Sequence, residues 1–180
     1  PLKEGRTAGV LLHITSLPGP YGTGDLGSEA RWFAKFLSEA GQRYWQVLPL
    51  NPPAGHAGSS PYDSVSAFAG NPLLISPGCL VADGWIDTAD LPPPLPDYPK
   101  ADFPSAFAVR EALFDRAFSR FSRSDPGDDF TTFCRKEGDW LEDYARFVAI
   151  SASLGGLPWT AWPAGLRDRE PAAIERVMHV

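Results

Sequence analysis

The first fifty residues alternate between apolar runs and an amphipathic stretch. Residues 10–15 form a short apolar run between a glycine and a proline, which is typical of a strand buried on both faces. Apolar residues then recur at helical spacing over residues 28–40, with Ser28 as candidate N-cap and Gly41 as the stop. The run at 44–50 is aromatic and branched and ends among prolines, as a second strand would. Strand, helix and strand together predict a βαβ unit with parallel strands and a right-handed crossover.

Each predicted strand is followed by an unusually long loop. These loops cover residues 16–27 and 51–70, whereas connections of this kind usually have about 2–6 residues. Both leave the carboxyl ends of parallel strands, which is the edge where parallel α/β sheets and barrels bind their ligands. The loops therefore indicate a functional face. The alternative is that they are insertions without a role in function.

The second half of the chain has the pattern of a helical region. A proline-rich stretch at residues 91–96 predicts an extended connector. Three helices are predicted beyond it, at residues 107–121, at residues 130–148 and from Pro171 onward. We therefore predict two parts: residues 1–86 hold the βαβ unit with its long loops, and residues 87–180 form a mainly helical subdomain.

Charge and hydropathy exclude two classes of partner. The chain has 22 acidic residues against 16 lysines and arginines, a formal net charge of −6. Because phosphate contacts supply most of the affinity for nucleic acids, we expect no nucleic-acid partner. The apolar runs are far shorter than the roughly 20 residues of a membrane helix, and no apolar signal-peptide core is present, so we expect no membrane partner. Two cysteines, Cys79 and Cys134, are too few for a disulfide scaffold, which favours a cytoplasmic location.

Cofactor and metal chemistry have little support. The run Gly22–Gly27 fits the pattern G-x-G-x-x-G, but its first glycine lies seven positions past Thr15, and no acidic residue follows Leu50 to bind a ribose. Three histidines lack potential ligands at metal-binding spacing, namely His13, His56 and His179. We therefore expect no cofactor and no metal, and we assign the glycines to tight turns and close backbone approach.

The loop after the second strand has the composition of a saccharide site. Residues 58–72 combine hydroxyl side chains such as Ser60 with a proline-fixed Tyr62 and a terminal Asn71. Sugars present an apolar ring face and hydroxyl groups, so an aromatic ring beside hydroxyl and amide groups suits them. An ordinary serine- and glycine-rich loop is the alternative. His13, near the end of the first strand, is either a hydrogen-bonded core histidine or a donor to a sugar hydroxyl.

Longer motifs in the same regions resemble a known family. The runs that carry the resemblance are Leu11–His13, Thr15–Gly22, Gly24–Gly27, Gly41–Leu50, Ser60–Tyr62 and Ser66–Pro72. They are similar to the amino-terminal signature of the 4-alpha-glucanotransferases, also called amylomaltases or disproportionating enzymes, which form glycoside hydrolase family 77. The match is dense over residues 6–86 and continues more thinly to Arg169, so it covers nearly the whole chain.

The resemblance implies a fold and an activity. The fold is α/β, the amino-terminal part of a (β/α)8 TIM barrel with a mainly helical insertion. Residues 1–86 would be the first βαβ unit of the catalytic barrel, and residues 87–180 the insertion. The implied activity transfers α-1,4-glucan segments between maltooligosaccharides, or dextrins of starch or glycogen, or onto glucose, by a retaining mechanism.

The same resemblance assigns substrate contacts but no catalytic residue. It implies that Tyr62 stacks on the donor glucose, that Ser60 is a neighbouring hydroxyl contact, and that Asn71 and His13 line the pocket. The family's catalytic carboxylates lie on later barrel strands, whose motifs are absent from these 180 residues, so we expect the chain by itself to be inactive. The alternatives are a stand-alone saccharide-binding module without catalysis, and a small α/β nucleotide-binding domain, which would need an acidic residue after Leu50.

Overall fold

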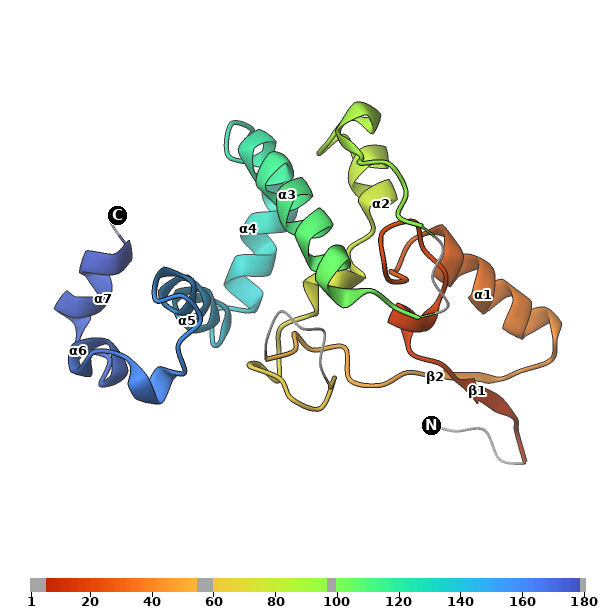
Figure 1. Cartoon of the computed structure of the whole chain (residues 1–180), viewed down its shortest axis with the longest axis horizontal. Coiled ribbons are helices and arrows are strands. Elements are labelled where there is room, and N and C mark those ends of the chain that lie inside the picture. The colour runs from red at the N-terminus through yellow and green to blue at the C-terminus, as the bar shows by residue number, and fades with distance from the viewer. Residues whose placement is uncertain (1–5, 55–59, 97–99, 179–180) are drawn as a thin grey trace. The chain divides into compact units, whose positions relative to one another are not determined.

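The two apolar runs near the amino terminus pair as parallel strands. The computed structural model describes residues 6–54, 60–96 and 100–178. Strand β1 (Gly9–Leu11) lies beside strand β2 (Tyr44–Gln46), with Val10 opposite Trp45. Helix α1 (Ser28–Glu39) connects the two strands (Figure 1). The predicted βαβ unit with parallel strands is therefore confirmed.

Both strands end earlier than predicted. The amide of Leu12 donates to the carbonyl of Gln46 at 3.0 Å, and the chain then forms a 3-10 turn, η1 (Ile14–Ser16). Because β1 leaves the sheet at this turn, no described strand lies opposite residues 47–50. The predictions of strands over residues 10–15 and 44–50 were therefore wrong in their carboxyl-terminal halves.

The amino end of α1 also differs from the prediction. Ser28 is the first helical residue, and the N-cap is Gly27, whose amide donates to Oδ1 of Asp25 at 2.8 Å. The choice of Ser28 as N-cap was therefore wrong. A glycine fits at the cap because a Cβ at position 27 would lie 2.4 Å from Oγ of Ser76.

The glycine-rich run packs closely against its own loop. A Cβ at Gly24 would lie 2.3 Å from the carbonyl oxygen of Ile14. Gly22 has a φ of +86°, which side chains rarely adopt, and a Cβ there would lie 2.6 Å from the carbonyl oxygen of Asp102. The interpretation of these glycines as turn and packing residues is therefore confirmed.

We expect Gly24→Ala to lower the free energy of unfolding by about 1–3 kcal/mol, because the added methyl group must displace backbone atoms. Gly70→Ala is the matched control, since a Cβ at Gly70 would meet nothing within 4 Å. Denaturant unfolding of the full-length protein measures both effects. Equal losses in the two variants would contradict the packing interpretation.

A small apolar core lies between α1 and the strands. Its buried members are Ile14, Leu17, Ala30 and Leu74, and Leu12, Phe33, Trp45 and Val47 pack against them. The rings of Phe33 and Trp45 meet edge to face, with centroids 5.0 Å apart. The indole of Trp45 also donates to the carbonyl of Leu12 at 2.7 Å, which fixes the end of β1.

The longest helix, α3 (Phe103–Phe121), begins four residues before its predicted start. Asp102 caps it, because its Oδ1 accepts from the amide of Ser105 at 3.1 Å, and Pro104 occupies the first turn. Three short helical elements between β2 and α3 were not predicted from the sequence: the turn η2 (Pro72–Leu74), α2 (Pro77–Ala82) and the turn η3 (Thr88–Asp90).

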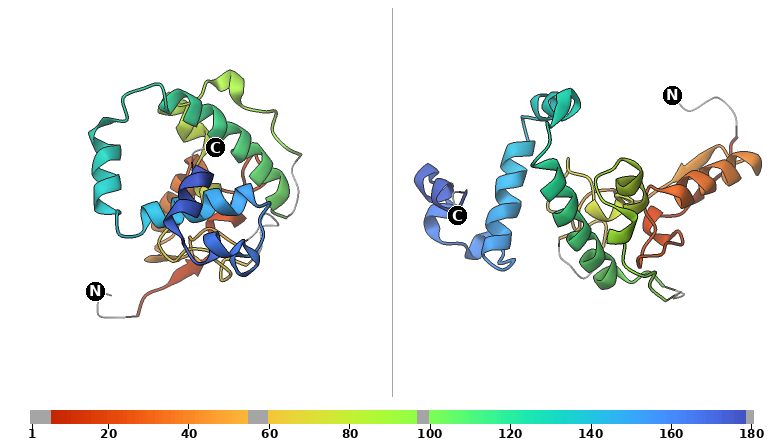
Figure 2. Two further views of the ribbon diagram at one scale, coloured as in Figure 1. Left: turned by 90° about the vertical axis from the view of Figure 1, so that its left-hand side faces the viewer. Right: turned by 90° about the horizontal axis from the view of Figure 1, so that it is seen from above.

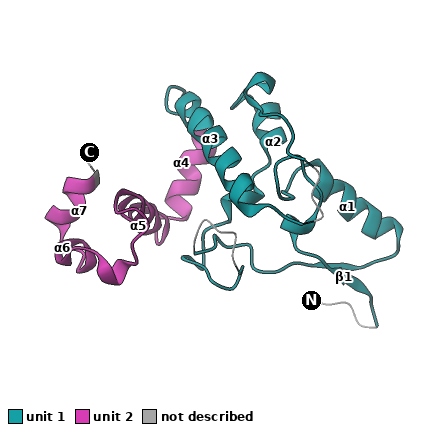
Figure 3. Cartoon of the chain, viewed as in Figure 1, with its two compact units in different colours: residues 1–125 teal, residues 126–180 magenta. Residues whose placement is uncertain are grey.

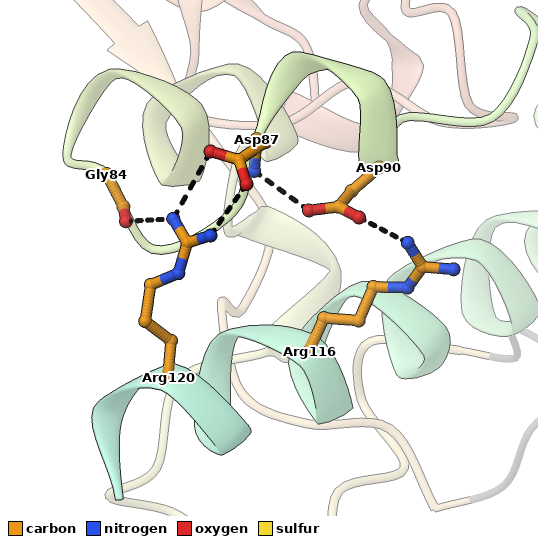
Figure 4. Close-up of polar contacts among 5 residues, drawn as sticks. All are labelled: Gly84, Asp87, Asp90, Arg116 and Arg120. Carbon is orange, nitrogen blue, oxygen red and sulfur yellow. Dashed lines mark hydrogen bonds and ion pairs between the residues drawn. The ribbon is translucent and has the colours of Figure 1, made fainter. Parts of the chain in front are cut away.

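Ion pairs hold α3 to the segment after α2 (Figure 4). Arg120 pairs with Asp87 at 2.7 Å and donates to the carbonyl of Gly84 at 2.7 Å, and Arg116 pairs with Asp90. The pKa of Asp90 lies below its ordinary value, first because its carboxylate accepts from the amide of Asp87 and second because of the guanidinium of Arg116. These pairs are partly exposed, so we assign them a role in orientation rather than in overall stability.

The chain forms two compact units, residues 1–125 and residues 126–180 (Figure 3). Helix α3 belongs to the first unit together with the βαβ unit. The boundary predicted after residue 86 separates the first βαβ unit of a barrel from a helical insertion. The division into two compact units does not test that boundary, which stays a prediction.

The second unit consists of helices and their connecting loops, with no strand in its described part (Figure 2). Its helices are α4 (Gly127–Lys136), α5 (Leu141–Ser153), α6 (Ala164–Arg167) and α7 (Pro171–Met178). The prediction of a single helix over residues 130–148 was wrong, because a turn separates α4 from α5. In this turn the indole of Trp140 donates to Oε2 of Glu137 at 2.7 Å. The start of the last helix at Pro171 is confirmed.

Candidate functional site

A cavity lies next to the point where both strands end. Its volume is about 250 Å³, and it is lined by His13, Thr15 and Ser16 after β1, by Leu48, Asn51, Pro53, Pro61 and Asn71 after β2, and by Phe103 of α3. Both predicted long loops therefore contribute to its wall. This position at the carboxyl ends of parallel strands is where such folds bind ligands.

His13 lines the cavity with an unsatisfied ring nitrogen. Its Nδ1 is buried and has no hydrogen-bond partner within the described part of the chain. Burial lowers the pKa of His13 from its ordinary value of 6.5, so the neutral ring is favoured at pH 7. A neutral imidazole can donate to or accept from a ligand hydroxyl. The residue lines the cavity, and its role as a donor to a sugar hydroxyl stays a prediction.

The lowered pKa of His13 predicts a pH dependence of stability. Because the unfolded chain binds this proton more readily than the folded chain, stability falls as the pH drops below the unfolded value. We expect the free energy of unfolding to decline more between about pH 7 and about pH 5 in the wild-type protein than in His13→Gln. Denaturant titrations at both pH values measure the difference. Identical declines would show that His13 does not titrate as described.

Asn71 has a structural role at the edge of the cavity. Its side chain is 9% exposed, and its Oδ1 accepts from the amide of Leu73 at 3.0 Å, which caps η2. The backbone amide of Asn71 donates to the backbone carbonyl of Leu50 at 2.7 Å. Asn71 therefore ties the end of the second long loop to the end of the chain segment that follows β2.

Tyr62 and Ser60 lie beside the cavity rather than in its wall. Pro61 between them lines the cavity, while the side chain of Tyr62 is 73% exposed. The amide of Tyr62 donates to Oγ of Ser60 at 3.2 Å. The structure therefore brings His13 and Asn71 together on one cavity and presents Tyr62 on the adjoining loop.

This loop is fixed by hydrogen bonds to the segment after β2. The amide of Ala54 donates to the carbonyl of Asp63 at 2.7 Å, and Oγ of Ser64 donates to the carbonyl of Pro52 at 2.7 Å. Ser66 Oγ accepts from the amide of Ala69 at 3.0 Å. The serines that suggested sugar contacts thus partly serve to fold the loop, which leaves Tyr62 in a defined place.

Ser16, Asn51 and Phe103 are among the lining residues of the cavity that the sequence did not predict. Phe103 could have been found, because Asp102 followed by a proline two positions later is a helix-start signal. No sequence pattern identified Asn51 as a lining residue. Its Nδ2 donates to the carbonyl of Ala69 at 3.2 Å, so it also joins the two ends of the second loop.

A second cavity, in the helical unit, has a volume of about 340 Å³. It is lined mainly by apolar residues of that unit's core, including Phe147, Trp162 and Leu166, and none of the predicted site residues reaches it.

Within the described ranges, no group of three or more His, Cys, Asp or Glu side chains could hold a metal ion. No helix in those ranges is long and apolar enough to cross a membrane. His56 and His179 lie outside the described residues.

The chain is similar to 4-alpha-glucanotransferases along almost its whole length. The sequence model of the family described as 4-alpha-glucanotransferase matches residues 12–179. The enzyme of that name from Thermus thermophilus is 47% identical over 174 residues, which are 94% of this chain and 33% of the relative. The chloroplastic/amyloplastic one from Solanum tuberosum is 42% identical over 178 residues, 96% of this chain and 31% of the relative.

A solved structure gives the same result for the fold. The amylomaltase from Streptococcus agalactiae in complex with acarbose superimposes with a TM-score of 0.87 at 34% identity, covering 96% of this chain and 35% of that one. The predicted fold class, part of an α/β amylomaltase barrel with added helices, is confirmed. The chain spans about a third of the length of these relatives.

Proposed function

The chain belongs to the 4-alpha-glucanotransferase family, glycoside hydrolase family 77, and from this membership we propose that the full-length protein transfers α-1,4-glucan segments between maltodextrin chains or onto glucose. One observation carries the proposal: the cavity at the carboxyl ends of β1 and β2 combines apolar walls with hydroxyl, amide and imidazole groups. That combination suits a sugar, whose ring face is apolar and whose edge carries hydroxyls.

We propose a retaining mechanism with catalytic groups outside these 180 residues. Retention requires a carboxylate nucleophile and a carboxylic acid/base about 5 Å apart. Within the part of the chain that the structure describes, no aspartate or glutamate lines the cavity. Asp25, the acidic residue of the first long loop, is engaged by Arg110 at 3.1 Å and is therefore a poor candidate. This chain then supplies substrate contacts, and the 180 residues by themselves are inactive.

Four residues of this chain are proposed as contacts to the glucan. His13 lines the cavity, and its lowered pKa favours the neutral ring, which can donate to or accept from a sugar hydroxyl. Asn71 lines the same cavity. Tyr62 offers an exposed aromatic face for stacking on the donor glucose, and Ser60 shapes its loop and carries a hydroxyl next to it.

We also propose a cytoplasmic location, and the absence of nucleic-acid and membrane partners. Both cysteines, Cys79 and Cys134, are free thiols, which suits a reducing compartment. The net charge of −6 disfavours nucleic acids. The alternative function is that of a saccharide-binding module. Such a module would bind a saccharide in the same cavity but would catalyse no reaction.

Maltotriose separates the two functions. A 4-alpha-glucanotransferase breaks one glycosidic bond of a maltotriose, releases glucose, and transfers the maltosyl group to the 4-hydroxyl of a second maltotriose to give maltopentaose. We expect the full-length protein to produce glucose and maltopentaose in equal initial amounts. Binding of maltotriose without either product would support the binding module instead.

A further inference from the structure

The aromatic wall of the cavity comes from α3 and not from Tyr62. Among the residues that the structure describes, Phe103 is the only phenylalanine, tyrosine or tryptophan that lines the cavity. We propose that Phe103 is the surface on which a glucose ring of the glucan rests in this cavity. The inference rests on the proposed function and names a substrate contact for the same site.

The chemistry of the cavity supports this assignment. Next to Phe103, the cavity wall includes the imidazole of His13, whose buried Nδ1 lacks a partner in the described structure, and the hydroxyl-bearing Ser16. An aromatic side chain beside imidazole and hydroxyl groups matches a sugar ring, which needs an apolar surface and hydrogen-bond partners at once. The volume of about 250 Å³ lies just below the range of about 300–1,000 Å³ for drug-sized pockets, so it suits one small ring.

The backbone on either side of Phe103 is held in place by hydrogen bonds in and before the first turn of α3. Asp102, the N-cap, donates its amide to the carbonyl of Gly22 at 2.8 Å, and Oδ1 of Asp102 accepts from the amide of Ser105. Further along α3, Nη2 of Arg110 pairs with Oδ2 of Asp25 at 3.1 Å. The first turn of α3 is thus fixed to the first long loop before any ligand arrives, which reduces the entropy lost on binding.

Substitutions at Phe103 in the full-length protein test the proposal with maltotriose as the probe. Phe103→Leu keeps an apolar side chain but removes the flat face, whereas Phe103→Tyr keeps the face. We expect Phe103→Leu to raise both KM and Kd for maltotriose by about tenfold, with kcat changed by less than about threefold, and Phe103→Tyr to stay within about threefold of wild type. Phe118→Ala is the matched control, since Phe118 lies on the same helix, is 66% exposed and does not line the cavity.

The outcomes separate the two claims. If the wild-type protein transfers maltosyl groups but Phe103→Leu has an unchanged KM and Kd, Phe103 is not a sugar contact and the proposed function stands. If the wild-type protein binds maltotriose without transferring it, the proposed function falls, and the Kd values of the Phe103 variants still decide the contact. A lower melting temperature of Phe103→Leu than of the wild-type protein, with an unchanged Kd, would mean that Phe103 only packs within the fold and would overturn the proposal.

Discussion

Replacement of Asp25 by asparagine is expected to lower the free energy of unfolding by about 3–5 kcal/mol, because it leaves a buried guanidinium without its counter-charge. Arg110 is 1% exposed, and its Nη2 lies 3.1 Å from Oδ2 of Asp25. Its Nη1 donates to the carbonyl of Tyr21 at 3.2 Å. Burial lowers the pKa of Arg110, and the carboxylate of Asp25 opposes that shift, so removing the carboxylate removes what stabilises the charged form. Denaturant unfolding of the full-length protein measures the loss.

Two further variants separate the charge effect from packing. Asp90→Asn removes the partner of Arg116 on the same helix, and because the Arg116 side chain is 57% exposed we expect little change. The double variant Asp25→Asn with Arg110→Met removes both charges, and we expect it to recover part of the stability lost in Asp25→Asn alone. Equal losses in Asp25→Asn and Asp90→Asn would contradict the description of the Arg110 pair as buried.

The Tyr62→Ala variant is expected to lower kcat/KM for maltotriose by about 10- to 100-fold, because it removes the exposed ring proposed to stack on the donor glucose. Tyr62→Phe keeps the ring and is expected to retain most of the activity. Folding should be unaffected, since the Tyr62 side chain is 73% exposed. Initial rates of glucose release from maltotriose measure the effect.

Trp32→Ala provides a control for general loss of exposed aromatic surface. Trp32 is 61% exposed, lies on α1 and stacks on Phe36 with ring centroids 5.7 Å apart. It lines neither of the two cavities described above. If Trp32→Ala reduced kcat/KM as much as Tyr62→Ala, the loss would not report on the sugar site.

The sequence predicted the elements whose pattern is local. The βαβ unit followed from two apolar runs and one amphipathic stretch, and the last helix followed from Pro171. It missed the break between α4 and α5, because both helices carry apolar faces at helical spacing and the periodicity continues across the interruption. The length of β1 was also missed, since the turn at Ile14 depends on packing into the core rather than on local propensity.

The sequence predicted a functional site at the carboxyl ends of the two strands, and the structure has a cavity there. His13, predicted near the end of the first strand, and Asn71, predicted at the end of the serine-rich segment after the second strand, both line it. Phe103 lies 90 residues after His13, and only the tertiary contacts of α3 with the first loop bring the two together. The position of Tyr62 outside the cavity wall likewise depends on how the serines fold its loop, which composition does not reveal.

The most direct test of the proposed function is the product pattern from maltotriose with the purified full-length protein. We predict that glucose and maltopentaose appear together at equal initial rates, because each transfer releases one glucose and extends one acceptor. Glucose with maltose and no maltopentaose would mean hydrolysis rather than transfer. Binding of maltotriose with no product would contradict the enzymatic claim and leave a saccharide-binding protein.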